Sequence, residues 1–132
     1  MILGIGTDIV LVARIRDALE KYGEHFVRRI FTEEECRYCE SQKYRVLHYA
    51  ARFAAKEAFS KAIGTGMTGD MTWKSVEIVK KRTGKPVLRM HGKIAETYGM
   101  CKVHVSLSHT TEAAIAVVTI ETDDISLLRS HE

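Results

Sequence analysis

The chain opens with Ile2-Leu3-Gly4-Ile5-Gly6-Thr7-Asp8-Ile9-Val10, an apolar run that only two glycines, a threonine and one acid interrupt. Such a run is typical of a buried strand, where a carboxylate is costly unless another group compensates it. Glu57 poses the same problem inside a strongly helical segment that also carries Arg52, Lys56 and Lys61. Two acids on rigid elements, surrounded by Lys and Arg, suit a hard divalent cation shared with a phosphate ligand.

Each acid also has a simpler interpretation when it is taken alone. Asp8 could cap the end of a strand, and Glu57 could be an exposed helix acid paired with Lys61 one turn later. The density of cations around Glu57, on a helix otherwise rich in alanine, favours the joint interpretation.

Hydrophobic periodicity along the rest of the chain predicts an α+β fold, a mainly antiparallel sheet packed with helices. Helical spacing or capping signals predict helices after Asp8 as far as Tyr22 and over residues 24–30, 33–41, 44–63 and 93–100, with Thr32 and Glu35 as a capping box. Residues 73–81 and 87–90 are predicted to form one hairpin, and residues 103–107 and 113–120 another. We expect a single domain over residues 1–121 and a polar, frayed C-terminal tail over residues 122–132.

Composition sets broad limits on the function. The 132 residues suffice for one core, and 45% hydrophobic with 28% charged residues is ordinary for a globular protein. No apolar run reaches the roughly 20 residues that a membrane span needs, and residues 1–10 lack the features of a signal peptide, so we expect a cytoplasmic protein. Cys36, Cys39 and Cys101 are then reduced, and the lone C-x-x-C has no second pair for zinc. The net charge of +3 favours an anionic ligand without choosing one.

Residues 64–69 match the G-x-G-x-x-G pattern of dinucleotide-binding loops. That fingerprint must follow a strand and open a helix, so that helix N-terminal amides meet the pyrophosphate. Here it follows a helix and precedes a strand, which indicates a helix C-cap and a loop instead.

Residues 103–110 place hydroxyls and imidazoles at the end of a strand. His104 and His109 are five positions apart, so they lie on opposite faces and cannot form a simple two-histidine metal site. A Ser–His nucleophile pair lacks the expected glycine pattern. Hydrogen bonding to a phosphate or a base of a ligand is the preferred interpretation.

Four segments together resemble the holo-acyl-carrier-protein synthases, the short type of 4′-phosphopantetheinyl transferase. They are Gly4 to Val10, Arg52 to Ala62, Gly84-Lys85-Pro86, and His104 to Thr110. The strand with Asp8 and the Lys-Glu-Ala-x-x-Lys helix are the specific parts, whereas Gly-Lys-Pro alone is weak. One departure is Leu11, which stands where the family usually has an acid, so a third carboxylate is in doubt.

The resemblance implies an enzyme that transfers 4′-phosphopantetheine from coenzyme A to a serine of apo acyl carrier protein, for fatty acid biosynthesis. It implies that Asp8 and Glu57 hold one Mg²⁺, that Glu57 or a water it orients accepts the serine proton, and that Lys61 stabilises the transferring phosphoryl group. It also implies a homotrimer with sites at subunit interfaces. The residues expected around the nucleotide half of coenzyme A are Lys43, Arg45, Arg52, Gly84, Lys85, Pro86, Ser106 and His109.

Carrier proteins are acidic, and Arg14 and Lys21 lie about two turns apart on one face of the helix after Asp8. With Arg28 they form the expected carrier-binding surface, although a merely solvated basic face is the simpler alternative. Two other functions remain open: a small basic module that binds nucleotides or nucleic acid, and a metal-dependent phosphohydrolase with water as nucleophile. The chain has 20 basic and 17 acidic residues and 8% aromatics, so we expect no nucleic-acid partner. Because it has no apolar run long enough to span a bilayer, we also expect no membrane partner.

Overall fold

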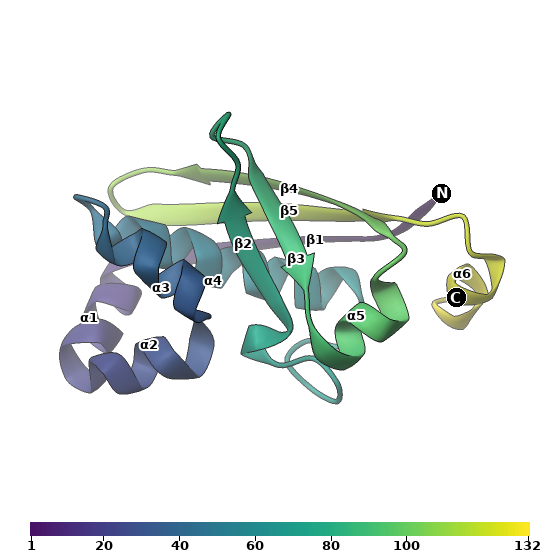
Figure 1. Cartoon of the computed structure of the whole chain (residues 1–132), viewed down its shortest axis with the longest axis horizontal. Helices are drawn as coiled ribbons and strands as arrows, with labels where there is room; N and C mark the ends of the chain where they lie inside the picture. Colours follow the sequence, from purple (N-terminus) through teal and green to yellow (C-terminus); the bar gives the residue numbers. More distant parts are fainter.

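The computed structural model describes residues 1–132 as an α+β fold with two antiparallel sheets (Figure 1). The elements are, in order, β1 (Ile2–Leu11), α1 (Val12–Tyr22), α2 (Glu24–Ile30), α3 (Glu33–Glu40), α4 (Arg45–Ala62), the 3₁₀ turn η1 (Trp73–Ser75), β2 (Val76–Lys80), β3 (Pro86–Met90), α5 (Gly92–Tyr98), β4 (Lys102–His109), β5 (Ala113–Glu121) and α6 (Ile125–Ser130). The main sheet has the strand order β1-β5-β4, and β2 and β3 form a separate hairpin. In Figure 1, α4 runs along one face of the main sheet while the hairpin crosses it steeply.

The opening strand differs from the expectation in one respect, because only one of its faces is buried. Gly6 and Val10 face the core, whereas Ile5 and Ile9 are each 64% exposed. Strand β1 is an edge strand, and its side chains alternate between α4 and the open face of the sheet. The apolar run therefore reflects two different surfaces rather than complete burial.

Helix α4 is the centre of the core, and its alanines allow β1 to approach it closely. Ala54, Ala55 and Ala58 are fully buried. A Cβ added to Gly6 would collide with the carbonyl oxygen of Ala58, so glycine at this position lets strand and helix backbones touch. This contact brings Asp8, two residues later on the same face, against the second half of α4.

A buried ion pair connects α3, α4 and β2. Lys56 Nζ lies 2.7 Å from Glu35 Oε1 and donates to the carbonyl oxygens of Trp73 and Val76, while Glu35 Oε2 accepts from the Ile78 amide at 3.0 Å. Glu35 also closes the predicted capping box with Thr32, which the structure confirms. Lys56 thus points into the core, away from the neighbouring Glu57, and is a structural cation.

Two segments differ from their predicted form. Residues 73–75 form η1, which Thr72 and Ser75 cap reciprocally, so the strand predicted from residue 73 begins at Val76. The tail expected to be frayed contains α6, whose N-cap Asp124 accepts from two backbone amides. His131 Nε2 lies 3.0 Å from the Tyr98 hydroxyl and fixes this helix beside α5. No helix in the structure combines the length and apolarity needed to cross a membrane.

Candidate active site

Asp8 of β1 meets Glu57 and Lys61 of α4 at one edge of the main sheet. Lys61 Nζ donates to Asp8 Oδ1 at 3.0 Å and to the Thr7 carbonyl oxygen at 3.2 Å. Only 16% of the Asp8 side chain is exposed, whereas Lys61 is about half exposed. Lys61 therefore pairs with the strand acid rather than with Glu57, one turn before it on α4.

The electrostatics of Glu57 show which groups surround it. Partial burial raises the pKa of this carboxyl above its usual value, and the negative charge of Asp8 raises it further. The positive charges of Lys61 and Arg14 oppose that shift. Helix α1 thus contributes a cation to the cluster of Asp8, Glu57 and Lys61, and two acids lie close enough to repel each other.

The donor set fits Mg²⁺. A cation between Asp8 and Glu57 would relieve their repulsion and would have only carboxylate oxygens from the protein, which hard cations prefer. No group of three or more His, Cys, Asp or Glu side chains comes together as a metal site. Mg²⁺ tolerates two protein ligands because it commonly keeps water and substrate phosphates as its other ligands.

A cavity of about 440 Å³ lies at the opposite edge of the main sheet, between α4, β2, β4 and the turn after β2. Six of the residues expected around the nucleotide line it: Arg52, Gly84, Lys85, Pro86, Ser106 and His109. None of its 13 lining residues is Asp or Glu, so the cavity is electropositive. Such a cavity favours phosphate groups.

Sequence reasoning missed two residues that also line this cavity, His48 and Lys80. Burial lowers the pKa of His48, and the charges of Arg52, Lys80 and His109 lower it further. The mutual influence of these groups shows how closely the cations gather. His48 lies on α4 and Lys80 on β2, so no local pattern in the sequence brings them together.

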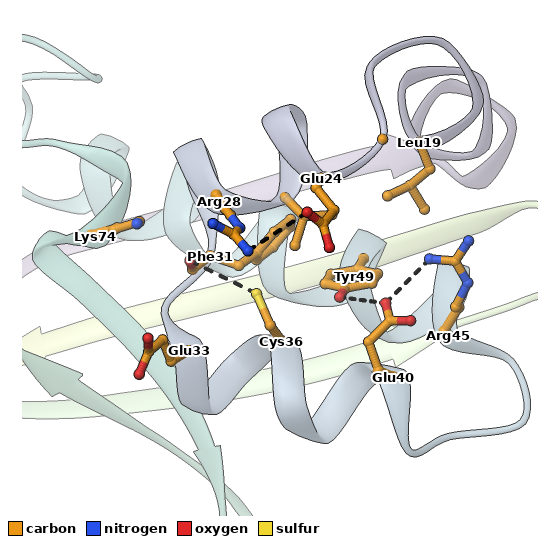
Figure 2. A pocket seen from close by; sticks show the side chains of 12 residues that line it. Leu19, Glu24, Arg28, Phe31, Glu33, Cys36, Glu40, Arg45, Tyr49 and Lys74 are labelled. Carbon is orange, nitrogen blue, oxygen red and sulfur yellow. Dashed lines mark hydrogen bonds and ion pairs between the residues drawn. The ribbon is translucent and has the colours of Figure 1, made fainter.

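Lys43 and Arg45, also expected near the nucleotide, lie outside this cavity. Arg45 Nη1 is 3.2 Å from Glu40 Oε2, which also accepts a hydrogen bond from the Tyr49 hydroxyl at 2.7 Å. Figure 2 shows these side chains converging in a second cavity, of about 630 Å³, between α2, α3 and the start of α4. Lys43 Nζ lies 5.4 Å above the Tyr44 ring. Their contact with the nucleotide stays a prediction.

The expected carrier-binding residues are exposed. Arg14 and Lys21 lie on α1, and Arg28 lies on α2 at the rim of the second cavity, 3.6 Å from Glu24 (Figure 2). Of the three, Arg14 is the residue whose charge lowers the pKa of Glu57. This arrangement connects the basic surface with the acids, and its role in carrier binding stays a prediction.

A family model described as the 4′-phosphopantetheinyl transferase superfamily matches residues 4–118. The chain belongs to this superfamily. The holo-[acyl-carrier-protein] synthase of Koribacter versatilis (strain Ellin345) is 47% identical over 124 residues, which cover 92% of this chain and 99% of that protein.

Solved structures of transferases from this superfamily share the fold. The holo-(acyl-carrier-protein) synthase from Bacillus anthracis str. Ames, in complex with CoA (3′,5′-ADP), has a TM-score of 0.81 and 38% identity, covering 93% of this chain and 99% of that one. The Neisseria meningitidis synthase has a TM-score of 0.85 and 38% identity, covering 92% and 100%. The predicted resemblance, the α+β fold and the assignment as a transferase are thereby confirmed.

Proposed function

We propose that this transferase moves 4′-phosphopantetheine from coenzyme A to a serine of apo acyl carrier protein and releases adenosine 3′,5′-bisphosphate. The observation that carries the proposal is the meeting of Asp8, Glu57 and Lys61, in a chain that also has an acid-free, cation-lined cavity. Asp8, Glu57 and Lys61 would act on the reacting pyrophosphate, and the cavity would bind the nucleotide phosphates.

The residues divide the chemistry between them. Asp8 and Glu57 would hold Mg²⁺, which supplies charge neutralisation at the pyrophosphate when bound. Glu57, whose pKa is raised, accepts the serine proton directly or through a water. Lys61, held by Asp8 and the Thr7 carbonyl oxygen, is placed to stabilise charge on the transferring phosphoryl group.

The two halves of the proposed site, the acids with Lys61 and the cation-lined cavity, face different directions within one chain. Asp8 pairs with Ala116 of β5, which pairs with Leu107 at the cavity, so the acids and the cavity are separated by two strand spacings, about 10 Å. Arg52 and Glu57 are also about 140° apart around α4. We therefore propose that the cavity of one chain faces the acids of a neighbour in a homotrimer.

The open face of the main sheet supports such an assembly. Ile5, Ile9 and Leu11 of β1 are exposed there, beside Ile115 and Val117 of β5. An apolar sheet face of this kind is typical of an interface between subunits. The three free cysteines fit a reducing compartment, and we place the enzyme in the cytoplasm, where it would serve fatty acid biosynthesis.

Mass spectrometry of the carrier tests the reaction. The protein is incubated with coenzyme A, Mg²⁺ and apo carrier protein, and the carrier should gain one phosphopantetheine. A phosphohydrolase would consume coenzyme A and leave the carrier unmodified, and a binding module would change neither. Either outcome would refute the transferase.

Mixing two inactive variants tests the shared site. Asp8→Ala removes one half of the site and Arg52→Ala the other. If each site uses two chains, unfolding and reassembling the two variants together should restore part of the activity. Two variants that stay inactive after verified co-assembly would place each site within one chain.

A further inference from the structure

Tyr38 of α3 stands behind the electropositive cavity and contacts three of the residues that line it. The guanidinium carbon of Arg52 lies 4.3 Å from the centre of the Tyr38 ring. Lys80 Nζ donates to the Tyr38 hydroxyl at 3.2 Å and lies 5.7 Å from the ring centre. The His48 ring meets Tyr38 edge-on at 5.5 Å.

Arg52 depends on this ring because it has almost no other partner. Its residue is only 4% exposed, its Nε has no hydrogen-bond partner, and Nη1 reaches only the His48 carbonyl oxygen at 3.5 Å. A buried guanidinium without a carboxylate is costly. An aromatic face offsets part of that cost without neutralising the charge. No protein carboxylate pairs with this guanidinium, so it is available to an incoming anion.

Lys80 completes the arrangement from another element. It belongs to β2, whereas Arg52 belongs to α4 and Tyr38 to α3. Two cations would repel each other in this small space, and the Tyr38 ring and hydroxyl hold both of them in place. One side chain thus preorganises the cationic wall from behind, without lining the cavity itself.

We propose that Tyr38 is a positioning residue that holds Arg52 and Lys80 for one phosphate of the nucleotide half of coenzyme A. This inference rests on the proposed function for the identity of the ligand. The aromatic face aligns the guanidinium, and the hydroxyl aligns the ammonium. Loss of the ring lets both side chains move, so the binding of coenzyme A weakens while the chemistry at Asp8, Glu57 and Lys61 is unchanged.

Kinetics of three variants test the role. Tyr38→Leu should raise KM for coenzyme A by about tenfold with little change in kcat. Tyr38→Phe keeps the stacking and should raise it by no more than about threefold. Tyr22→Leu is the matched control, because Tyr22 also lies under a lysine, 5.3 Å from Lys21 Nζ, but away from the cavity. It should leave KM for coenzyme A unchanged.

Stability and direct binding separate this role from a structural one. Thermal denaturation identifies a variant that fails to fold, and calorimetry with coenzyme A reads binding without turnover. A folded Tyr38→Leu variant that binds coenzyme A normally would overturn the inference, as would a loss of stability and kcat at constant KM. Absence of transfer by the unmodified protein would instead refute the proposed function.

Dephospho-coenzyme A, which lacks the ribose 3′-phosphate, identifies the phosphate concerned. If Tyr38→Leu weakens the binding of coenzyme A but not of the dephospho form, the cationic wall of Arg52 and Lys80 binds the ribose phosphate. If it weakens both equally, the wall binds the pyrophosphate. If Tyr38→Leu binds both forms as tightly as the unmodified protein does, the inference is overturned.

Discussion

Lys61 and Asp8 are 53 residues apart in sequence, yet the lysine Nζ lies 3.0 Å from the carboxylate Oδ1. This pair closes the contact between β1 and α4 and leaves Glu57 without an ion-pair partner. The same helix face thus presents a restrained cation and an acid of raised pKa toward one point. Both properties are needed for phosphoryl chemistry in which a proton must leave and charge must be stabilised.

Removal of the Lys61 ammonium should affect turnover more than binding. Lys61→Ala should lower kcat by about 100-fold, with a smaller change in KM for coenzyme A, because we propose that the Lys61 charge stabilises the transferring group. Steady-state kinetics with varied coenzyme A measure both values. Lys93→Ala is a matched control, since Lys93 lies 3.8 Å from Asp70 in an exposed pair. A change confined to KM would make Lys61 a ground-state phosphate binder.

Loss of either acid should abolish metal-dependent transfer and preserve the fold. Asp8→Ala and Glu57→Ala each remove one of two expected ligands, so calorimetric titration with Mg²⁺ should show no binding in either variant. Circular dichroism should be unchanged. Full activity in a folded variant of either kind would refute this metal site.

A methyl group at residue 6 should be more damaging than its size suggests. Gly6→Ala places a Cβ against the Ala58 carbonyl oxygen, so β1 must move away from α4. We expect a loss of at least about 2 kcal/mol in the free energy of unfolding, measured with urea. Gly64→Ala is the comparison, because Gly64 has a φ of 84° but no atom within 4 Å of an added Cβ. It should lose only about 1 kcal/mol. Equal losses would contradict the close packing.

Charge reversal on the basic surface should affect the carrier protein selectively. Arg28→Glu should raise KM for the carrier severalfold and leave KM for coenzyme A unchanged, and added salt should act in the same way. Adding Arg14→Glu should increase the effect, although Arg14 also acts on Glu57 and its reversal should lower kcat. Arg129→Glu, on α6, is the control. Equal effects on both substrates would exclude this docking surface.

Glu77 should make stability depend on pH in acid. Burial would raise its pKa, but hydrogen bonds from Thr32 and His91 and nearby positive charge outweigh burial, so the pKa lies below the usual 4.5. Glu77 therefore stabilises the fold above about pH 4.5, and this contribution disappears as pH falls through the lower folded-state value. Glu77→Gln should lower Tm at pH 7, and the difference from the unmodified protein should shrink as the pH falls below 4.5. Glu96→Gln, at an exposed site on α5, should leave Tm unchanged. A Tm difference for Glu77→Gln that is independent of pH would contradict this.

Local patterns predicted the elements and the two acids because those signals lie within short segments. The spacing around Glu57 and the strand around Asp8 each occupy about ten residues, and the capping box at Thr32 needs four. Residues 64–69 follow helix α4 and precede η1, so they lack the strand-to-helix context of a dinucleotide-binding loop, as predicted.

Long-range contacts were not predictable in the same way. The sequence places Lys56 among the cations around Glu57, yet adjacent helix positions point about 100° apart, and its partner Glu35 is on another helix. Arg45 forms an ion pair with Glu40, and hydrophobic periodicity does not predict this pair. The contacts of Tyr38 join three elements, and His131, which follows the helix in residues 125–130, contacts Tyr98 of α5.

The buried pair of Lys56 and Glu35 has a consequence for how such sequences diverge. Either charge left alone in the core would be strongly destabilising, whereas a joint replacement by apolar residues of similar volume is often tolerated. Positions 35 and 56 should therefore covary among related sequences and pass together between a charged and an apolar state. Position 57, the next residue along the chain, should instead keep its acid in related sequences that are active transferases, whichever residues occupy positions 35 and 56. We therefore expect two adjacent residues of one motif to be selected separately, Lys56 for folding and Glu57 for chemistry.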